Sequence, residues 1–91
     1  MVEFNGLKYE IVENKKDAFH IEEFENRYSE ILKKYDYIVG DWGHSQLRLK
    51  GFYEPSNRRK DAFESTIDLL EDYLYEYCNF GCAYFVLRKV N

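Results

Sequence analysis

The chain has 91 residues, enough for one domain and too few for a second hydrophobic core. An aromatic content of 19% argues against a disordered chain, and a formal net charge of −4 argues against a dedicated nucleic-acid binder, which usually has a basic footprint. No apolar run is long enough to cross a bilayer, and the first residues lack the features of a signal peptide. We therefore expect a cytoplasmic protein without a membrane anchor.

The first third of the chain predicts a hairpin followed by a helix. Residues 2–13 alternate apolar and polar side chains around Asn5-Gly6, a pair typical of a hairpin turn in which both residues need positive φ. From residue 20 the apolar side chains follow helical spacing, with acidic residues in the first turn and lysines in the last. This pattern predicts one helix over residues 20–34.

The remaining two thirds predict two strands, a second helix and a last strand. In chain order these are strands 37–40 and 46–53 around a turn, a polar loop over 54–60, a helix over 61–79, and a strand over 82–90. The last strand is apolar on both faces, as in a central strand that is covered on both sides. We therefore expect one α+β domain over residues 1–91, of order ββαββαβ, with two helices on a mostly antiparallel sheet of about five strands.

Two cysteines lie close together in the stretch YEYCNFGCAYF, residues 75–85. A zinc site needs about four ligands, and the two histidines of the chain, His20 and His44, lie far apart on different elements. A redox pair favours a helix N-terminus, whereas Cys78 falls at the end of a predicted helix. We therefore expect Cys78 and Cys82 to be small buried side chains with reduced thiols and no metal or cofactor. Their spacing would also allow a disulfide bond to form under oxidation.

Several stretches resemble the YutD-like family of small proteins from Gram-positive bacteria. They are RYSEIL (27–32), YDYIVGDWG (35–43), QLRLKGF (46–52) and LEDYLYEYCNFGCAYFVLRK (70–89), whereas EPSNRRKDAFES (54–65) matches no pattern of the family. The resemblance extends over most of the chain and implies a bacterial, cytoplasmic protein. It implies no reaction and assigns no functional residue, and only a loose transcription-regulator label attaches to some members.

The stretch GDWGHS, residues 40–45, is the first candidate site. A tryptophan at a turn would be a natural anchor for a protein partner, since Trp is enriched among interface hot spots. The alternative is that Trp42 folds back and covers one end of the core. A catalytic pair of Asp41 and His44 ranks below both, because no nucleophile accompanies it in a recognisable pattern.

Basic residues form the second candidate site. Arg48 and Lys50 share one face of a predicted strand, and the cations of the following loop are Arg58, Arg59 and Lys60. Together with nearby aromatic rings they are able to contact RNA or DNA, but a solvated strand face and loop explain them better. The second predicted helix has the opposite charge, because it has five carboxylates at helical spacing and no Lys or Arg between residues 61 and 76.

These patterns favour a non-catalytic protein-interaction or regulatory module over an enzyme. We expect its contact surface to include Trp42, His44, Arg48 and Lys50, with an unidentified protein as the partner. The alternative is a nucleic-acid-associated regulator that uses Arg48, Lys50 and the three cations of the loop. Strand order and oligomeric state stay open at this point.

Overall fold

The computed structural model describes residues 1–4, 6–43, 45–56, 66–77 and 81–90. Its strands are β1 (Val2–Phe4), β2 (Leu7–Lys15), β3 (Tyr37–Gly43), β4 (Gln46–Phe52) and β5 (Tyr84–Val90). Its helices are α1 (Ile21–Arg27) and α2 (Leu70–Tyr77), with short 3-10 helices η1 (Glu30–Lys34) and η2 (Ile67–Leu69). The predicted α+β class and the order ββαββαβ are confirmed.

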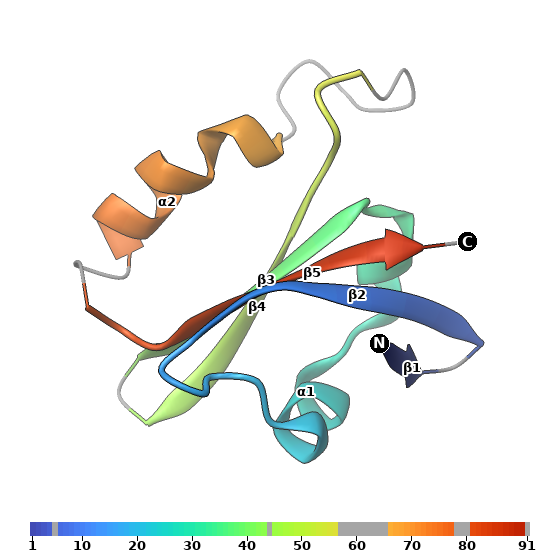
Figure 1. Cartoon of the computed structure of the whole chain (residues 1–91), viewed down its shortest axis with the longest axis horizontal. Coiled ribbons are helices and arrows are strands. Elements are labelled where there is room, and N and C mark those ends of the chain that lie inside the picture. The colour runs from blue at the N-terminus through green and yellow to red at the C-terminus, as the bar shows by residue number, and fades with distance from the viewer. Residues whose placement is uncertain (5, 44, 57–65, 78–80, 91) are drawn as a thin grey trace.

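The five strands form one sheet in the order β1-β2-β5-β3-β4, and all neighbouring strands are antiparallel. The last strand of the chain therefore lies in the middle of the sheet, as its two apolar faces predicted. Helix α1 lies on one face of the sheet and α2 on the other (Figure 1). Within the described residues, no helix is long and apolar enough to cross a membrane.

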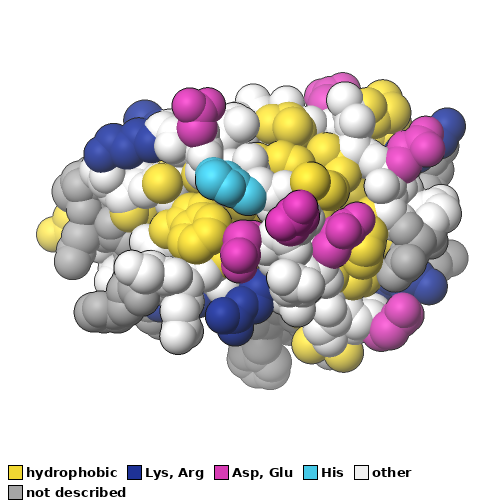
Figure 2. Space-filling model, turned by 90° about the horizontal axis from the view of Figure 1, so that it is seen from below, with side chains coloured by type: hydrophobic (Ala, Val, Ile, Leu, Met, Phe, Trp, Pro, Cys, Tyr) yellow, Lys and Arg dark blue, Asp and Glu magenta, His cyan; other side chains and the backbone are white. Residues whose placement is uncertain are grey.

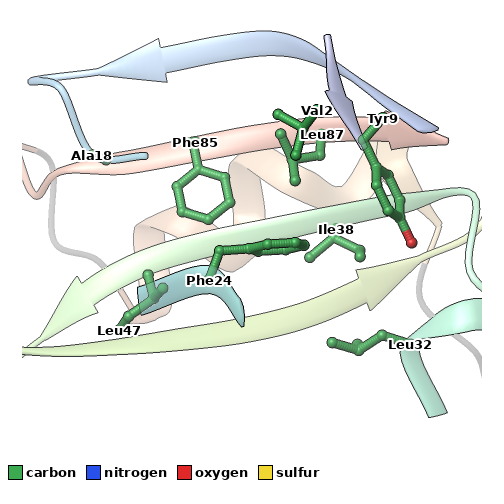
Figure 3. Packing of buried hydrophobic residues seen from close by; sticks show 9 residues of the cluster. All are labelled: Val2, Tyr9, Ala18, Phe24, Leu32, Ile38, Leu47, Phe85 and Leu87. Atoms are coloured by element: carbon green, nitrogen blue, oxygen red, sulfur yellow. The ribbon is translucent and has the colours of Figure 1, made fainter. Parts of the chain in front are cut away.

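The face toward α1 carries the larger hydrophobic core. It contains Val2, Tyr9, Ala18, Phe24, Leu32, Ile38, Leu47, Phe85 and Leu87 (Figure 3). Gly40 lies directly beneath the ring of Phe85, where an added Cβ would collide with the ring. The close approach of this ring to β3 therefore requires a glycine.

The face toward α2 carries a smaller core. Its buried residues are Val39, Phe52 and Val86, and the residues packed against them include Ile67, Leu70 and Tyr73 from the η2–α2 segment. The ring of Tyr73 meets that of Phe52 edge-on, with 5.5 Å between the centroids. Among the described side chains of the η2–α2 segment, only these three pack against this core, so the polar contacts of α2 with the sheet matter for its position.

The prediction of one continuous helix over residues 20–34 is wrong. Tyr28 and Ser29 have extended backbones, with ψ of 137° and 146°, and they separate α1 from η1. The ring of Tyr28 packs edge-on against Phe4 of the first hairpin, at 4.7 Å between centroids. Contacts with the sheet thus override the local helical pattern, as is usual for short helices whose stability comes from tertiary packing.

The second predicted helix is interrupted at Thr66. Thr66 is extended and forms a parallel bridge with Tyr53, and Ile67 N–H donates a hydrogen bond of 2.8 Å to the Tyr53 carbonyl. The described helical turns of this segment run from Ile67 to Tyr77. The first five residues of the predicted helix, 61–65, and its last two, 78–79, lie outside the described residues.

Tyr9 provides a test of the α1-side core. Its side chain is fully buried, and neither its hydroxyl nor that of Tyr28 has a hydrogen-bond partner. Burial, and to a smaller extent the Tyr28 hydroxyl, raises the pKa of Tyr9 well above its ordinary value of 10.0. Because the folded state holds this proton more tightly than the unfolded chain, the resulting stability is complete below pH 10 and is lost as the pH rises through the folded-state pKa.

We therefore expect Tyr9→Phe to move alkaline unfolding to higher pH. At neutral pH the free energy of unfolding should change by less than about 1 kcal/mol, because the removed hydroxyl makes no hydrogen bond. Circular dichroism recorded against pH and against urea measures both effects. An unchanged alkaline midpoint would contradict the assignment of Tyr9 to alkaline sensitivity.

Candidate functional site

Trp42 lies within β3, on the face of the sheet that α1 covers. Gly43 pairs with Gln46, so β3 extends past Trp42, which is a strand residue rather than a turn residue. Its indole Nε1 donates a hydrogen bond of 2.8 Å to the Ala18 carbonyl. The half-buried indole thereby ties the segment between β2 and α1 to β3.

The surface next to Trp42 is acidic. The ring of His20 stands edge-on to the indole, with 5.7 Å between the centroids. Glu22 and Glu23 follow in the first turn of α1. Figure 2 shows this side of the molecule, where carboxylates surround a histidine that lies against a large hydrophobic side chain. His44, the other predicted member of this site, lies outside the described residues.

Replacing the indole tests how much of its role is structural. We expect Trp42→Phe to lower the free energy of unfolding by about 1 kcal/mol, because the hydrogen bond to Ala18 is lost while most of the ring packing is kept. Urea unfolding followed by circular dichroism measures this. A change within error of zero would mean that the indole hydrogen bond does not stabilise the fold.

Arg48 lies on the opposite face of the sheet and bonds to a buried carboxylate. Asp41 is fully buried and forms an ion pair with Arg48 on the neighbouring strand, and it also accepts a hydrogen bond of 3.0 Å from the Tyr73 hydroxyl of α2. The hydrogen bond to Asp41 and its charge raise the pKa of Arg48. Asp41 thus joins β3, β4 and α2, and the charge of Arg48 is matched within the molecule.

The residues predicted to form one contact surface are therefore divided between the two faces of the sheet. Trp42 pairs with Leu47 on the α1 side, whereas Arg48 pairs with Asp41 on the α2 side. Lys50 shares the α2 side, and its Nζ lies 5.4 Å from the centre of the Phe52 ring. The three loop cations of the alternative nucleic-acid site, Arg58, Arg59 and Lys60, lie outside the described residues. The structure therefore does not place Arg48 or Lys50 beside Trp42.

A groove of about 480 Å³ lies on the α2 side of the sheet, between α2 and the ends of β2 and β5. We call it the α2 groove. Helix α2 contributes Glu71, Asp72, Leu74 and Tyr75 to its lining. Lys15 and Tyr84 line it from the paired strands β2 and β5, and Gly81 and Cys82 line it before β5 begins.

The chain's own lysines contact the sheet side of the α2 groove. Nζ of Lys15 lies 5.8 Å from the centre of the Tyr84 ring. Nζ of Lys16 donates a hydrogen bond to the Gly81 carbonyl. Burial first, then a hydrogen bond to Glu13 and the charges of Glu13 and Glu71, raise the pKa of Tyr84. The phenol of Tyr84 therefore stays protonated between carboxylates from both walls.

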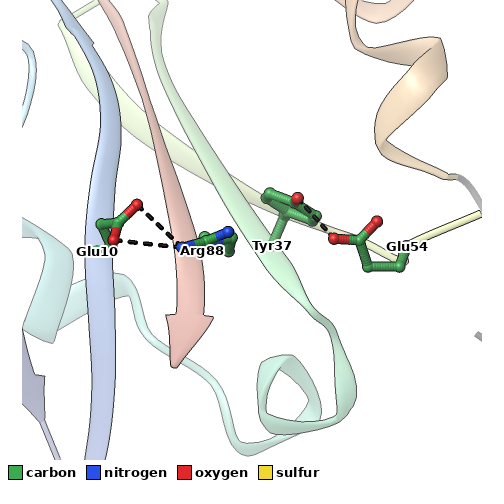
Figure 4. A network of polar contacts seen from close by, with 4 residues as sticks. All are labelled: Glu10, Tyr37, Glu54 and Arg88. Carbon is green, nitrogen blue, oxygen red and sulfur yellow. Dashed lines mark hydrogen bonds and ion pairs between the residues drawn. The ribbon is translucent and has the colours of Figure 1, made fainter. Parts of the chain in front are cut away.

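The carboxylates of α2 that line the groove differ from the other carboxylates on this side of the sheet in their partners. Arg88 is paired with Glu10 at 3.2 and 3.3 Å, and the Tyr37 hydroxyl donates a hydrogen bond of 2.7 Å to Glu54 (Figure 4). Among the described residues, by contrast, no Lys or Arg forms an ion pair with Glu71 or Asp72. The α2 groove thus has two acidic groups that the described part of the fold leaves unmatched.

Cys82, the one cysteine that the structure describes, differs from expectation. Cys82 is half-buried and takes part in a disulfide bond, whereas a reduced thiol was expected. Cys78 lies outside the described residues. Within the described part of the chain, no group of three or more His, Cys, Asp or Glu side chains is placed to hold a metal ion.

Comparison with known proteins identifies the family. The family model described as "Putative antitoxin YutD-like" matches residues 3–88. A relative from Bacillus subtilis (strain 168), named "Putative antitoxin YutD", is 57% identical over 90 residues, which cover 99% of this chain and 98% of the relative. The solution NMR structure of protein yutD from B. subtilis has 55% sequence identity and a TM-score of 0.83, covering all of this chain and 82% of that one. The family resemblance predicted from the sequence is confirmed, and the chain belongs to the YutD-like family.

Proposed function

We propose that this protein is a non-catalytic, antitoxin-type module that binds a partner protein in the cytoplasm and silences it by stoichiometric binding. The name of the family and of the B. subtilis relative supports a protein partner, since an antitoxin acts by neutralising another component. A purely binding role needs an accessible surface rather than a reactive centre.

The observation that carries the proposal is the α2 groove. Its hydrophobic and aromatic lining, from Leu74, Tyr75 and Tyr84, is combined with the carboxylates of Glu71 and Asp72. A concave surface with an apolar floor and a few polar groups is the usual form of a binding site. Tyr75 is 63% exposed, and exposed tyrosines are frequent anchors in protein interfaces.

The surface around Trp42, predicted from the sequence, stays a second proposed contact area. The indole hydrogen bond to Ala18 serves the fold, but the ring is half-buried and leaves an edge beside His20 for a partner. RNA or DNA is the alternative ligand. Less supports it, because the charge of Arg48 is matched by Asp41.

Capture and growth experiments test the proposal together. The tagged chain is incubated with nuclease-treated lysate of B. subtilis, the organism of the relative described above, and bound proteins are identified. Each candidate partner is then expressed with and without this chain. We expect one partner that forms a one-to-one complex in solution and slows growth when expressed alone, and we expect co-expression to restore growth.

Two outcomes would contradict the proposal. In the first, no captured protein slows growth, or co-expression fails to relieve the effect. In the second, nucleic acid is retained without nuclease, every partner is lost with it, and binding weakens steeply with salt, which would favour the nucleic-acid alternative.

A further inference from the structure

We infer that the α2 groove receives an arginine side chain from the partner protein. This inference rests on the proposed function and specifies its chemistry. It follows from the charge of one wall, the aromatic rings of both walls, and the cation that the chain itself already places there.

The helical wall of the groove is strongly acidic. Residues 67–77 contain four carboxylates, those of Asp68, Glu71, Asp72 and Glu76, and no Lys or Arg. Two of them, Glu71 and Asp72, line the groove directly. Like charges three or four residues apart on a helix destabilise it slightly, and a cation from a partner would relieve that repulsion. Charge complementarity therefore favours a basic group as the occupant.

The aromatic rings favour a planar cation. Tyr84 lines one wall and Tyr75 the other, so a cation between them is able to contact a ring face as well as a carboxylate. Guanidinium groups stack on aromatic rings, form paired hydrogen bonds to carboxylates, and are more weakly hydrated than ammonium groups. An arginine satisfies both features of the groove, whereas a lysine satisfies mainly its charge.

Lys15 shows how the groove holds a cation. Its Nζ lies 5.8 Å from the centre of the Tyr84 ring, within the range of a cation–π contact. An arginine from a partner would displace this ammonium group or share the ring with it. Lys15 is therefore expected to compete with the partner's arginine rather than to assist it.

Small arginine analogues test the site without the partner. The probes are Nα-acetyl-arginine amide, the corresponding lysine amide, and the corresponding citrulline amide, which has nearly the shape of arginine but no charge. Amide chemical shifts of the labelled protein report where each probe binds. We expect saturable shifts in Glu71–Tyr75 and Gly81–Tyr84 with arginine. The Kd should be about tenfold weaker with citrulline, because its urea still donates hydrogen bonds to the carboxylates but lacks the positive charge that makes such bonds roughly twice as strong.

Matched variants separate this site from general electrostatics. The double variant Glu71→Gln/Asp72→Asn should weaken arginine binding about tenfold. The control Glu25→Gln/Glu30→Gln removes two exposed carboxylates from α1 and η1, on the other face of the sheet, and should leave the Kd unchanged. Lys15→Gln should tighten binding about threefold, because it removes the competing cation.

Each result supports or overturns the inference. Equal binding of citrulline and arginine, equal losses in the two double variants, or shifts confined to another surface would overturn it. Lysine binding as tightly as arginine would overturn the preference for a planar cation. A partner that binds Glu71→Gln/Asp72→Asn as well as wild type would refute the inference and leave the proposed function intact. Arginine binding in the groove without any growth-relieving partner would instead refute the proposed function.

Discussion

Phe24→Ala is expected to lower the free energy of unfolding by about 3–5 kcal/mol, which is the range for truncating a buried Phe. Phe24 is the only fully buried side chain of α1. Its ring lies in the middle of the α1-side core, against the rings of Phe4, Tyr9, Phe19, Tyr28 and Phe85 at 5.7 to 6.4 Å between centroids. A small domain is stable by roughly 0.05–0.15 kcal/mol per residue, so this loss would remove much of the total.

Urea unfolding followed by circular dichroism measures this loss. The control is Ile21→Ala, on the same helix, whose side chain is 42% exposed and should cost less than about 1 kcal/mol. Similar losses in the two variants would mean that α1 is not held to the sheet through Phe24.

Asp41→Ala is expected to cost about 2–3 kcal/mol and to loosen α2. The carboxylate is fully buried and bonds to both Arg48 and Tyr73, so the variant loses two hydrogen bonds to a charged group. This loss is smaller than the loss expected on breaking a fully buried ion pair, because the Arg48 side chain is 48% exposed and water solvates it when Asp41 is removed. The bond to Tyr73 connects the sheet to α2, whose described apolar contacts with this core come from Leu70 and Tyr73.

Amide hydrogen exchange distinguishes this effect from general destabilisation. Relative to wild type, Asp41→Ala should raise the exchange rates of the α2 amides more than those of the β5 amides, because α2 opens without unfolding of the sheet. Lys50→Ala, on the same face of β4, is the control and should leave the exchange of α2 unchanged. Exchange that rises equally in α2 and β5 would contradict the role of Asp41 as the link between them.

Much of the fold follows from local patterns in the sequence. The period-two alternation around Asn5-Gly6 predicted the first hairpin, and the apolar character of both faces of residues 82–90 predicted the central position of β5. The break at Tyr28 could not be predicted, because it depends on the ring of Phe4 from a distant strand. Local helical spacing contains no information about that contact.

The candidate site was harder to predict. Gly43 of β3 pairs with Gln46 of β4, and that register alone places Asp41 opposite Arg48. The sequence predicted a turn over residues 41–45, so it did not predict this pair and placed Trp42 outside the strand. The burial of Asp41 depends on Tyr73, 32 residues away, and the α2 groove combines side chains from β2, α2 and β5. Sequence reasoning identified the acidic helix but had no means of finding its facing wall.

The most direct test of the binding role is amide hydrogen exchange of this protein alone and in a one-to-one complex with its captured partner. We predict slower exchange in the complex for α2 and for the described residues of the facing wall, 13–15 and 81–84, and a loss of this protection in Glu71→Gln/Asp72→Asn. Protection confined to β4 or to α1, with α2 unchanged, would contradict the assignment of the α2 groove as the contact surface.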